Sequence, residues 1–391
     1  MAKRFEDNYC LQEKGSTFMD EIKLRDANTQ RFNFLSDEIS IWSGVANDDG
    51  TITVTRLGEK ILTKTIKAQH VDDAMFHTAT VVPYQFNGTG LFLGYKGKTK
   101  IDFIPISAAC KLSILNRGKF SLTGELNDGS LGICPMALAR VIEDSIKKFS
   151  KKIKVIVVHG KVIGIMSDRY CPIPQEELTN MVYRVLCNRY PNSVIEGGII
   201  TNRITTVNFD LKHQIAERGI DYEILMSLYN SDNGYSGVRL VHECRQVGKN
   251  YVYPFYDDDW HSDHIAVTMQ DIEQGADTMF LKLRNNVALL ANAQERLLKH
   301  PYIYADAVIG QLNKMSAHKG GAKITKAMTK DILQTIDTFV SQGIQKEFTV
   351  MDVADVMIQT IPNGSSDTTE NALMKTIMRI IHINHDEYDK I

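Results

Sequence analysis

Close cysteine pairs and long apolar runs are both missing from this chain. Its 391 residues include six cysteines, and no two of them form a Cys-x-x-Cys pair. Zinc ribbons and redox sites need neighbouring thiolates, so this spacing argues against both and favours reduced thiols. No apolar run approaches the roughly 20 residues of a membrane span, and the opening residues MAKRFEDNYC lack the apolar stretch of a secretion signal. We therefore expect a cytoplasmic protein that does not contact membranes.

An excess of charge of either sign is also missing. The 45 basic residues face 47 acidic ones and leave a net charge of -2. A balanced chain has no general attraction to nucleic acid or to membrane surfaces, so any basic surface must be local. The composition, 43% hydrophobic and 24% charged, is that of an ordinary globular protein. At about 100–200 residues per domain, the length predicts two or three folded units.

The short motifs of common active sites are absent as well, since the sequence contains no GxxxxGK[ST], GxSxG or HExxH. The glycine-rich stretch FNGTGLFLG, residues 86–94, leads into another strand rather than a helix, so we interpret it as hairpin turns. In HEC, residues 242–244, alternate positions of a strand share a face, which predicts a buried Cys244 beside a hydrogen-bonded His242. We assign no catalytic residue and expect a non-enzymatic protein without a cofactor.

Two kinds of hydrophobic pattern divide the chain near residue 266. Residues 51–265 mix short strands, in which β-branched residues alternate, with helices such as residues 134–149. Residues 266–391 show helical periodicity throughout. Residues 1–50 are polar and mixed, which predicts a loosely ordered arm. We therefore predict an α+β protein, with a mixed or antiparallel sheet and helices in the N-terminal part and an all-helical C-terminal part.

Two groups of lysines are candidates for contact with nucleic acid. The first crosses a predicted helix end and strand start, and consists of Lys147, Lys148, Lys151 and Lys152. Lysines at a helix C-terminus also offset the helix dipole, which is the structural alternative. The second lies in residues 307–330, which contain no carboxylate, and consists of Lys314, Lys319, Lys323, Lys326 and Lys330. Gly320-Gly321 at its centre predicts a mobile loop that follows a phosphate backbone, with a merely solvated loop as the alternative.

The most polar concentration in the chain is YDDDWHSDH, residues 256–264. Its side chains include Asp257, Asp259, His261 and His264, which are ligands that a divalent ion accepts. The spacing matches no calcium loop, because no glycine lies at the middle and no glutamate closes it. We favour an acidic surface loop and keep a divalent metal site as the alternative.

Several segments together resemble a known family. KVIGIMSDRYCPIPQEEL, residues 161–178, is similar to a strand that ends in Ser-Asp-Arg-Tyr and is followed by a loop and a helix. YNSDNGYSGVRL is similar to an Asn-Ser-x-x-Gly stretch before an Arg-containing strand and a Cys. These segments resemble the phage/plasmid-like protein family of unknown function over residues 100–265. The matched positions are Ser167, Asp168, Arg169, Tyr170, Asn230, Ser231, Gly234, Arg239 and Cys244.

The chain departs from that family after Cys244, where CRQVGKN replaces a Cys-x-Asn-Gly turn. The matched positions also have physical interpretations. Arg169 is a forked donor for a phosphate or for an internal carboxylate, and Tyr170 offers a ring on which a base can stack. The second stretch predicts a tight hairpin whose exposed tip residues, Asn230 and Ser231, border a site.

The resemblance implies a mobile-element context and no established reaction. We therefore expect a phage- or plasmid-encoded accessory protein of the host cytoplasm that binds nucleic acid, with single-stranded DNA and a homo-oligomer both compatible with this role. DNA replication or recombination is the process in which such a protein would act. The alternatives are a phage structural or host-defence-interaction protein, and a metal-dependent nuclease or nucleotide-processing enzyme.

Overall fold

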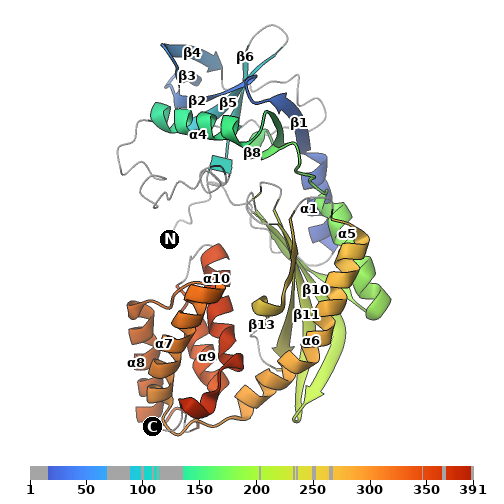
Figure 1. Ribbon diagram of the computed structural model, residues 1–391, viewed down its shortest axis with the longest axis vertical. Helices are drawn as coiled ribbons and strands as arrows, with labels where there is room; N and C mark the ends of the chain where they lie inside the picture. The colour runs from blue at the N-terminus through green and yellow to red at the C-terminus, as the bar shows by residue number, and fades with distance from the viewer. Residues whose placement is uncertain are drawn as a thin grey trace.

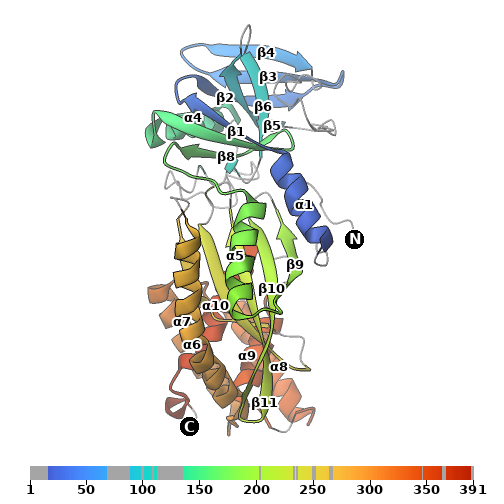
Figure 2. The same cartoon turned by 90° about the vertical axis from the view of Figure 1, so that its right-hand side faces the viewer.

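Figures 1 and 2 show an elongated molecule in a computed structural model, with a first β-sheet at one end and a second sheet packed with helices in the remainder. The structure describes residues 16–67, 89–97, 101–107, 110–111, 114, 135–201, 204–231, 234, 237–248, 252–263, 267–345, 347–362 and 367–388. The strands end at Ser262, and the described elements from Met269 onward are helical. The predicted α+β class, strand-rich first and helical afterwards, is confirmed.

The first sheet has eight strands in the order β1-β7-β8-β6-β5-β2-β3-β4. Neighbouring strands are antiparallel except β6 and β8. Their bounds are β1 Thr29–Leu35, β2 Ile39–Ala46, β3 Thr51–Leu57, β4 Ile61–Lys67, β5 Thr89–Lys96, β6 Ile101–Ile106, β7 Lys152–Val158 and β8 Lys161–Ser167. Helix α4 (Pro135–Phe149) lies on one face and buries Ala139, Ile142 and Ile146, whose spacing is helical.

Two expectations about this sheet need correction. Residues 16–46 are not a loose arm, because they form helix α1 (Ser16–Ala27) and then β1 and β2. Phe18 and Ile22 of α1 are fully buried against α5 and β9, and each such side chain contributes about 1.5–3 kcal/mol by burial. Gly94 is inside β5 rather than in a turn. The ring nitrogen of Trp42 would lie 2.7 Å from a Cβ at Gly94, so glycine makes room for that ring.

The second sheet is an antiparallel meander in the order β13-β12-β11-β10-β9, with β14 also paired to β12. Its strands are β9 Val194–Ile200, β10 Thr205–Glu217, β11 Ile220–Asn230, β12 Val238–Gln246, β13 Val252–Pro254 and β14 Trp260–Ser262. Helices α5 (Gln175–Arg189) and α6 (Met269–Glu295) cover one face of it (Figure 2). The predicted β11–β12 hairpin is therefore present, although residues 231–237 make its loop longer than a two-residue turn.

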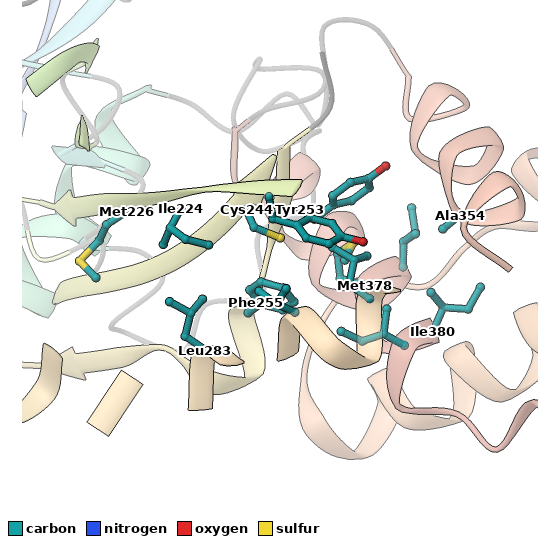
Figure 3. Packing of buried hydrophobic residues seen from close by; sticks show 14 of the residues in the cluster. Ile224, Met226, Cys244, Tyr253, Phe255, Leu283, Ala354, Met378 and Ile380 are labelled. Carbon is teal, nitrogen blue, oxygen red and sulfur yellow. The ribbon is translucent and has the colours of Figure 1, made fainter. Parts of the chain in front are cut away.

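The C-terminal helices continue the core of the second sheet rather than forming a separate one. They are α7 Pro301–Lys319, α8 Lys326–Ser341, α9 Val350–Gln359 and α10 Asp367–Met378, with short 3-10 turns η2 Tyr256–Asp258, η3 Arg379–His382 and η4 His385–Glu387. Figure 3 shows Cys244, Tyr253 and Phe255 of the sheet region beside Met378 and Ile380. None of the helices in the described ranges combines the length and apolarity needed to cross a bilayer.

Candidate functional site

The structure brings Arg169 next to the first lysine group. Asp168 lies just after β8, and its backbone N–H donates to the carbonyl of Lys152 at the start of β7, at 3.2 Å. Lys148, Lys151, Lys152 and Arg169 are all exposed, and we call them the α4–β7 patch. No carboxylate of the described residues forms an ion pair with Arg169, so the alternative of an internal partner is not observed.

Carboxylates lie within the same area as the α4–β7 patch. Asp168 is exposed beside Arg169 in the chain. The backbone N–H of Ser36 donates to the carbonyl of Lys151 at 2.9 Å, which brings the exposed Asp37 and Glu38 to the patch. A polyanion that approached these cations would also meet three anions, so the patch is of mixed sign.

Lys147 belongs to a buried ion-pair network instead of the α4–β7 patch. Its Nζ lies 2.6 Å from Oε1 of Glu143, whose side chain is only 1% exposed. Arg56 of β3 contacts the same oxygen at 2.7 Å, and the N–H of Ile41 donates to the other at 3.0 Å. Burial opposes the charge of Glu143, but Arg56 and Lys147 together hold its pKa below the usual range. Lys147 therefore has a structural partner.

Tyr170 joins the two segments that carry the family resemblance. Its hydroxyl donates to the carbonyl of Ser231 at 2.9 Å, and Lys154 donates to the carbonyl of Tyr170 at 2.6 Å. The ring packs against a small apolar cluster in the first sheet, made of Ile156, Val158 and Ile163. We expected this ring to stack a base, but its observed partners are structural.

Asn230 and Ser231 are each only 1% exposed, which corrects the expectation of an exposed tip. Asn230 donates through Nδ2 to Oε1 of Gln175 at 2.6 Å, and Gln175 is fully buried at the start of α5. Gly234 has φ of 71°, as expected for a turn glycine, while Asp232 and Asn233 lie outside the described residues. Together with the Tyr170–Ser231 hydrogen bond, these contacts fasten the end of β11 to the segment in which the chain passes from the first sheet to α5.

The three consecutive aspartates of the acidic stretch, residues 256–264, form ion pairs and do not lie on a free surface loop. Asp257 receives a bidentate contact from Arg379, with Nε to Oδ2 at 2.6 Å and Nη2 to Oδ1 at 2.8 Å, and Lys375 lies 3.4 Å away. Burial opposes the charge of Asp257, but these two cations hold its pKa below the usual range. The guanidinium of Arg379, which is 1% exposed, therefore occupies the place beside the Asp257 carboxylate that a metal ion would need.

The neighbouring carboxylates are also paired. Lys282 lies 2.7 Å from Asp258, and Arg239 forms an ion pair with Asp259 while its guanidinium lies 5.0 Å from the ring centroid of Tyr256. Of the proposed metal ligands, Asp257 and Asp259 are thus bound by cations. Within the described ranges, no group of three or more histidine, cysteine or carboxylate side chains is arranged to hold a metal ion, and His264 lies outside those ranges.

His242 and Cys244 are both fully buried, as the strand alternation predicts. The His242 ring stacks on Phe255 with centroids 5.0 Å apart, and its Nε2 lies 3.2 Å from Nδ2 of Asn286. Burial lowers the pKa of His242 to about 4 and raises that of the Cys244 thiol, so the histidine is neutral and the thiol is protonated at neutral pH.

Glu243 is a titratable residue that no sequence motif marks as functional. It faces away from His242 on β12, and burial raises the pKa of its carboxyl to about 7, even though the Ser227 hydroxyl favours the charged form. This carboxyl can gain or lose a proton near neutral pH. The signal in the sequence was weak, because a single carboxylate between buried strand residues is compatible with a solvated face.

The second lysine group lies on α7, α8 and the loop between them. Lys314, Lys319, Lys323, Lys326 and Lys330 are all exposed, and we call them the α7–α8 lysine group. None of the five makes an ion pair with any residue that the structure describes. Figures 1 and 2 show the α7–α8 pair at the opposite end of the long axis from α4, so the two basic surfaces are separate.

The loop that carries this group is fastened, which corrects the expectation of a mobile Gly320-Gly321 centre. Arg379 donates to the carbonyls of Gly320 and Lys319 at 2.6 and 3.1 Å. The N–H of Ala322 donates to Ala372 of α10 at 3.0 Å. Gly321 has φ of 123°, and a Cβ there would lie 2.6 Å from Oγ1 of Thr376. The glycines therefore permit close packing on α10 rather than free motion.

Further contacts fix the end of the loop. The side chain of Asn313 accepts from the N–H of Ile324 at 2.8 Å and donates to its carbonyl at 3.0 Å. Ile324 is 1% exposed, and Thr325 caps α8 by accepting from the N–H of Met328. The lysine ammonium groups are therefore presented on an ordered backbone. That order lowers the conformational entropy lost when an anion binds.

Comparison of the chain with family models, with curated proteins and with solved structures gave no match. The resemblance to the phage/plasmid-like family stays a prediction from the quoted segments. The function must therefore be inferred from the surface of this molecule.

Proposed function

We propose that this protein is a non-enzymatic nucleic-acid-binding protein and that the α7–α8 lysine group is its interface. The observation that supports the proposal is that none of these five lysines forms an ion pair with an acid that the structure describes, although Asp331 follows Lys330 in the chain. Residues 307–330 contain no carboxylate, and the fold brings no described acid into an ion pair with any of the five lysines. An ammonium group without a protein partner is available to a phosphate.

The position of the lysines supports this role further. Lys323 and Lys326 flank the N-terminus of α8, where the helix dipole adds partial positive charge. Each lysine that contacts a phosphate releases condensed counterions, so the affinity must fall steeply with salt. For four such contacts the slope of log K against log salt is about -3 to -4.

The test compares two variants that lose the same charge. One replaces Lys319, Lys323, Lys326 and Lys330 by Gln, and the matched control replaces Lys148, Lys151, Lys152 and Arg169 by Gln. Fluorescence anisotropy with a labelled oligonucleotide is measured between about 50 and 200 mM salt. We expect the first variant to lose about 100-fold or more in affinity and most of its salt slope, and the control to lose less than about fivefold.

Two results would overturn the proposal. One is equal weakening in both variants, which would mean that only overall charge matters. The other is a wild-type affinity that does not change with salt, which would exclude phosphate contacts. Circular dichroism checks that both variants are folded, as expected for exposed side chains.

A further inference from the structure

A groove runs along α8 next to two members of the α7–α8 lysine group. Its volume is about 440 Å³, and it is lined by Tyr302, Lys326, Thr329, Lys330, Leu333, Gln334 and Asp337. Lys326 and Lys330 are four residues apart, so their Cα atoms are separated by about 6 Å along the helix axis. The groove therefore has cations along one wall and an aromatic ring in its lining.

Tyr302 is an unusual surface residue. It lies at the start of α7 with 47% of its surface exposed, next to Ile303, which is 41% exposed. In contrast, Tyr304 is fully buried and its hydroxyl is 2.7 Å from Nδ1 of His385. Among the described residues the Tyr302 ring stacks on no other aromatic ring or guanidinium. Exposed aromatic rings of this kind are the platforms on which unpaired bases stack.

We propose that this groove holds an unpaired nucleobase against Tyr302 while Lys326 and Lys330 contact the adjoining phosphates, so that the interface selects single strands over duplexes. This inference rests on the proposed function and adds the class of nucleic acid. Bases in a duplex are stacked and paired, and they cannot present a face to Tyr302 without being unstacked. Lysines spaced along a helix, with an aromatic ring beside them, match the elements of single-strand recognition.

The groove also sets a direction for the strand. The short connection between α7 and α8 makes them antiparallel, which places Tyr302 toward the Asp337 end of α8. Asp337 repels phosphate, whereas its carboxylate and the Gln334 amide can accept hydrogen bonds from base amino groups. The phosphates therefore belong at the Lys326 and Lys330 end, and the base belongs at the Tyr302 end.

The experiment measures binding of Tyr302→Ala, Tyr302→Phe and the wild type to a single strand and to a duplex of equal length. We expect Tyr302→Ala to bind the single strand about 5- to 100-fold more weakly, the range of one stacking contact, with duplex affinity changed less than about twofold. Tyr302→Phe keeps the ring and should bind both as the wild type does. Tyr302→Trp adds a second readout, because its fluorescence should be quenched by the single strand and not by the duplex.

The outcomes separate this inference from the proposed function. If Tyr302→Ala binds single strands normally while the four-lysine variant does not, the lysine interface stands and the stacking site is wrong. If the four-lysine variant also binds normally, the proposed function is wrong. A wild-type protein that binds duplex as tightly as single strand also overturns the inference.

Discussion

The two basic surfaces of this protein are both rich in lysine, but their surroundings differ. In the α4–β7 region the lysines share space with Asp168, Asp37 and Glu38, and Lys147 is held by Glu143. In the α7–α8 lysine group Asp331 and Asp337 follow the lysines on α8, but no described acid is paired with any of the five lysines, and the backbone beneath is fastened by Arg379. A run of lysines therefore indicates a binding surface only after the acids that the fold brings to it have been counted.

The largest effect is expected for Glu143, whose ion pairs with Arg56 and Lys147 give the α4–β7 region its structural role. Replacing Glu143 by Ala should reduce the free energy of unfolding by about 3 kcal/mol, because Arg56, Lys147 and the N–H of Ile41 all lose their partner. Asp144→Asn is the matched control, since Asp144 is an exposed carboxylate that pairs with Arg140 at 3.1 Å and should cost less than about 1 kcal/mol. Urea unfolding measures both, and a similar small loss in each would contradict the assigned network.

Acid should weaken the same network. The pKa of Glu143 is lower in the folded protein than its ordinary 4.5, so its stabilisation is fully present above that pH and is lost as the pH falls through the folded value. The wild type should therefore lose stability more steeply on acidification below about pH 4.5 than Glu143→Gln does. Identical pH profiles for the two proteins would show that Glu143 does not titrate with folding.

The next prediction concerns the α7–α8 lysine group and tests whether its lysines bind only when Arg379 holds the loop backbone in place. Arg379→Met removes the link between Asp257 and the carbonyls of Lys319 and Gly320 while every lysine stays in place. We expect a loss of about 2 kcal/mol in stability, because the partly exposed Asp257 keeps Lys375 as a partner. We also expect faster proteolysis at Gly320-Gly321 and weaker oligonucleotide binding. Unchanged affinity with a loosened loop would show that charge alone suffices.

The contrast extends to Glu243, a half-buried carboxylate of β12 that forms no ion pair with a described cation. Glu243 has a folded pKa of about 7, above its ordinary 4.5, so the stability it contributes is complete below that lower value and is lost as the pH rises through the higher one. Glu243→Gln stays neutral and should be more stable than the wild type above about pH 7, by roughly 1–3 kcal/mol, with little difference below about pH 4.5. Calorimetry across this pH range measures the stability difference between Glu243→Gln and the wild type. A variant that is less stable than the wild type at all pH values would contradict the prediction.

Local patterns in the sequence predicted much of the fold. Helix α4 and the β11–β12 hairpin follow from apolar spacing and turn glycines, which depend on near neighbours. Residues 16–46 were missed because polar residues surround the buried pair Phe18 and Ile22. The candidate site was only half predictable. Its lysines were visible as a run in the sequence. The approach of Asp37 and Glu38 to the α4–β7 patch and the fastening of the α7–α8 loop by Arg379 depend on long-range contacts that no local pattern encodes.

The smallest expected effect contrasts two tyrosines that a sequence alone cannot tell apart. Tyr170 has a packed ring and a hydroxyl that donates to Ser231, whereas Tyr302 is exposed. Tyr170→Phe should therefore reduce the free energy of unfolding by about 0.5–1.5 kcal/mol, the value of one hydrogen bond, and should leave oligonucleotide affinity unchanged. Tyr302→Phe should leave both unchanged, because its hydroxyl bonds to no described residue. If Tyr170→Phe weakened binding while stability stayed constant, the α4–β7 region would have to be restored as an interface.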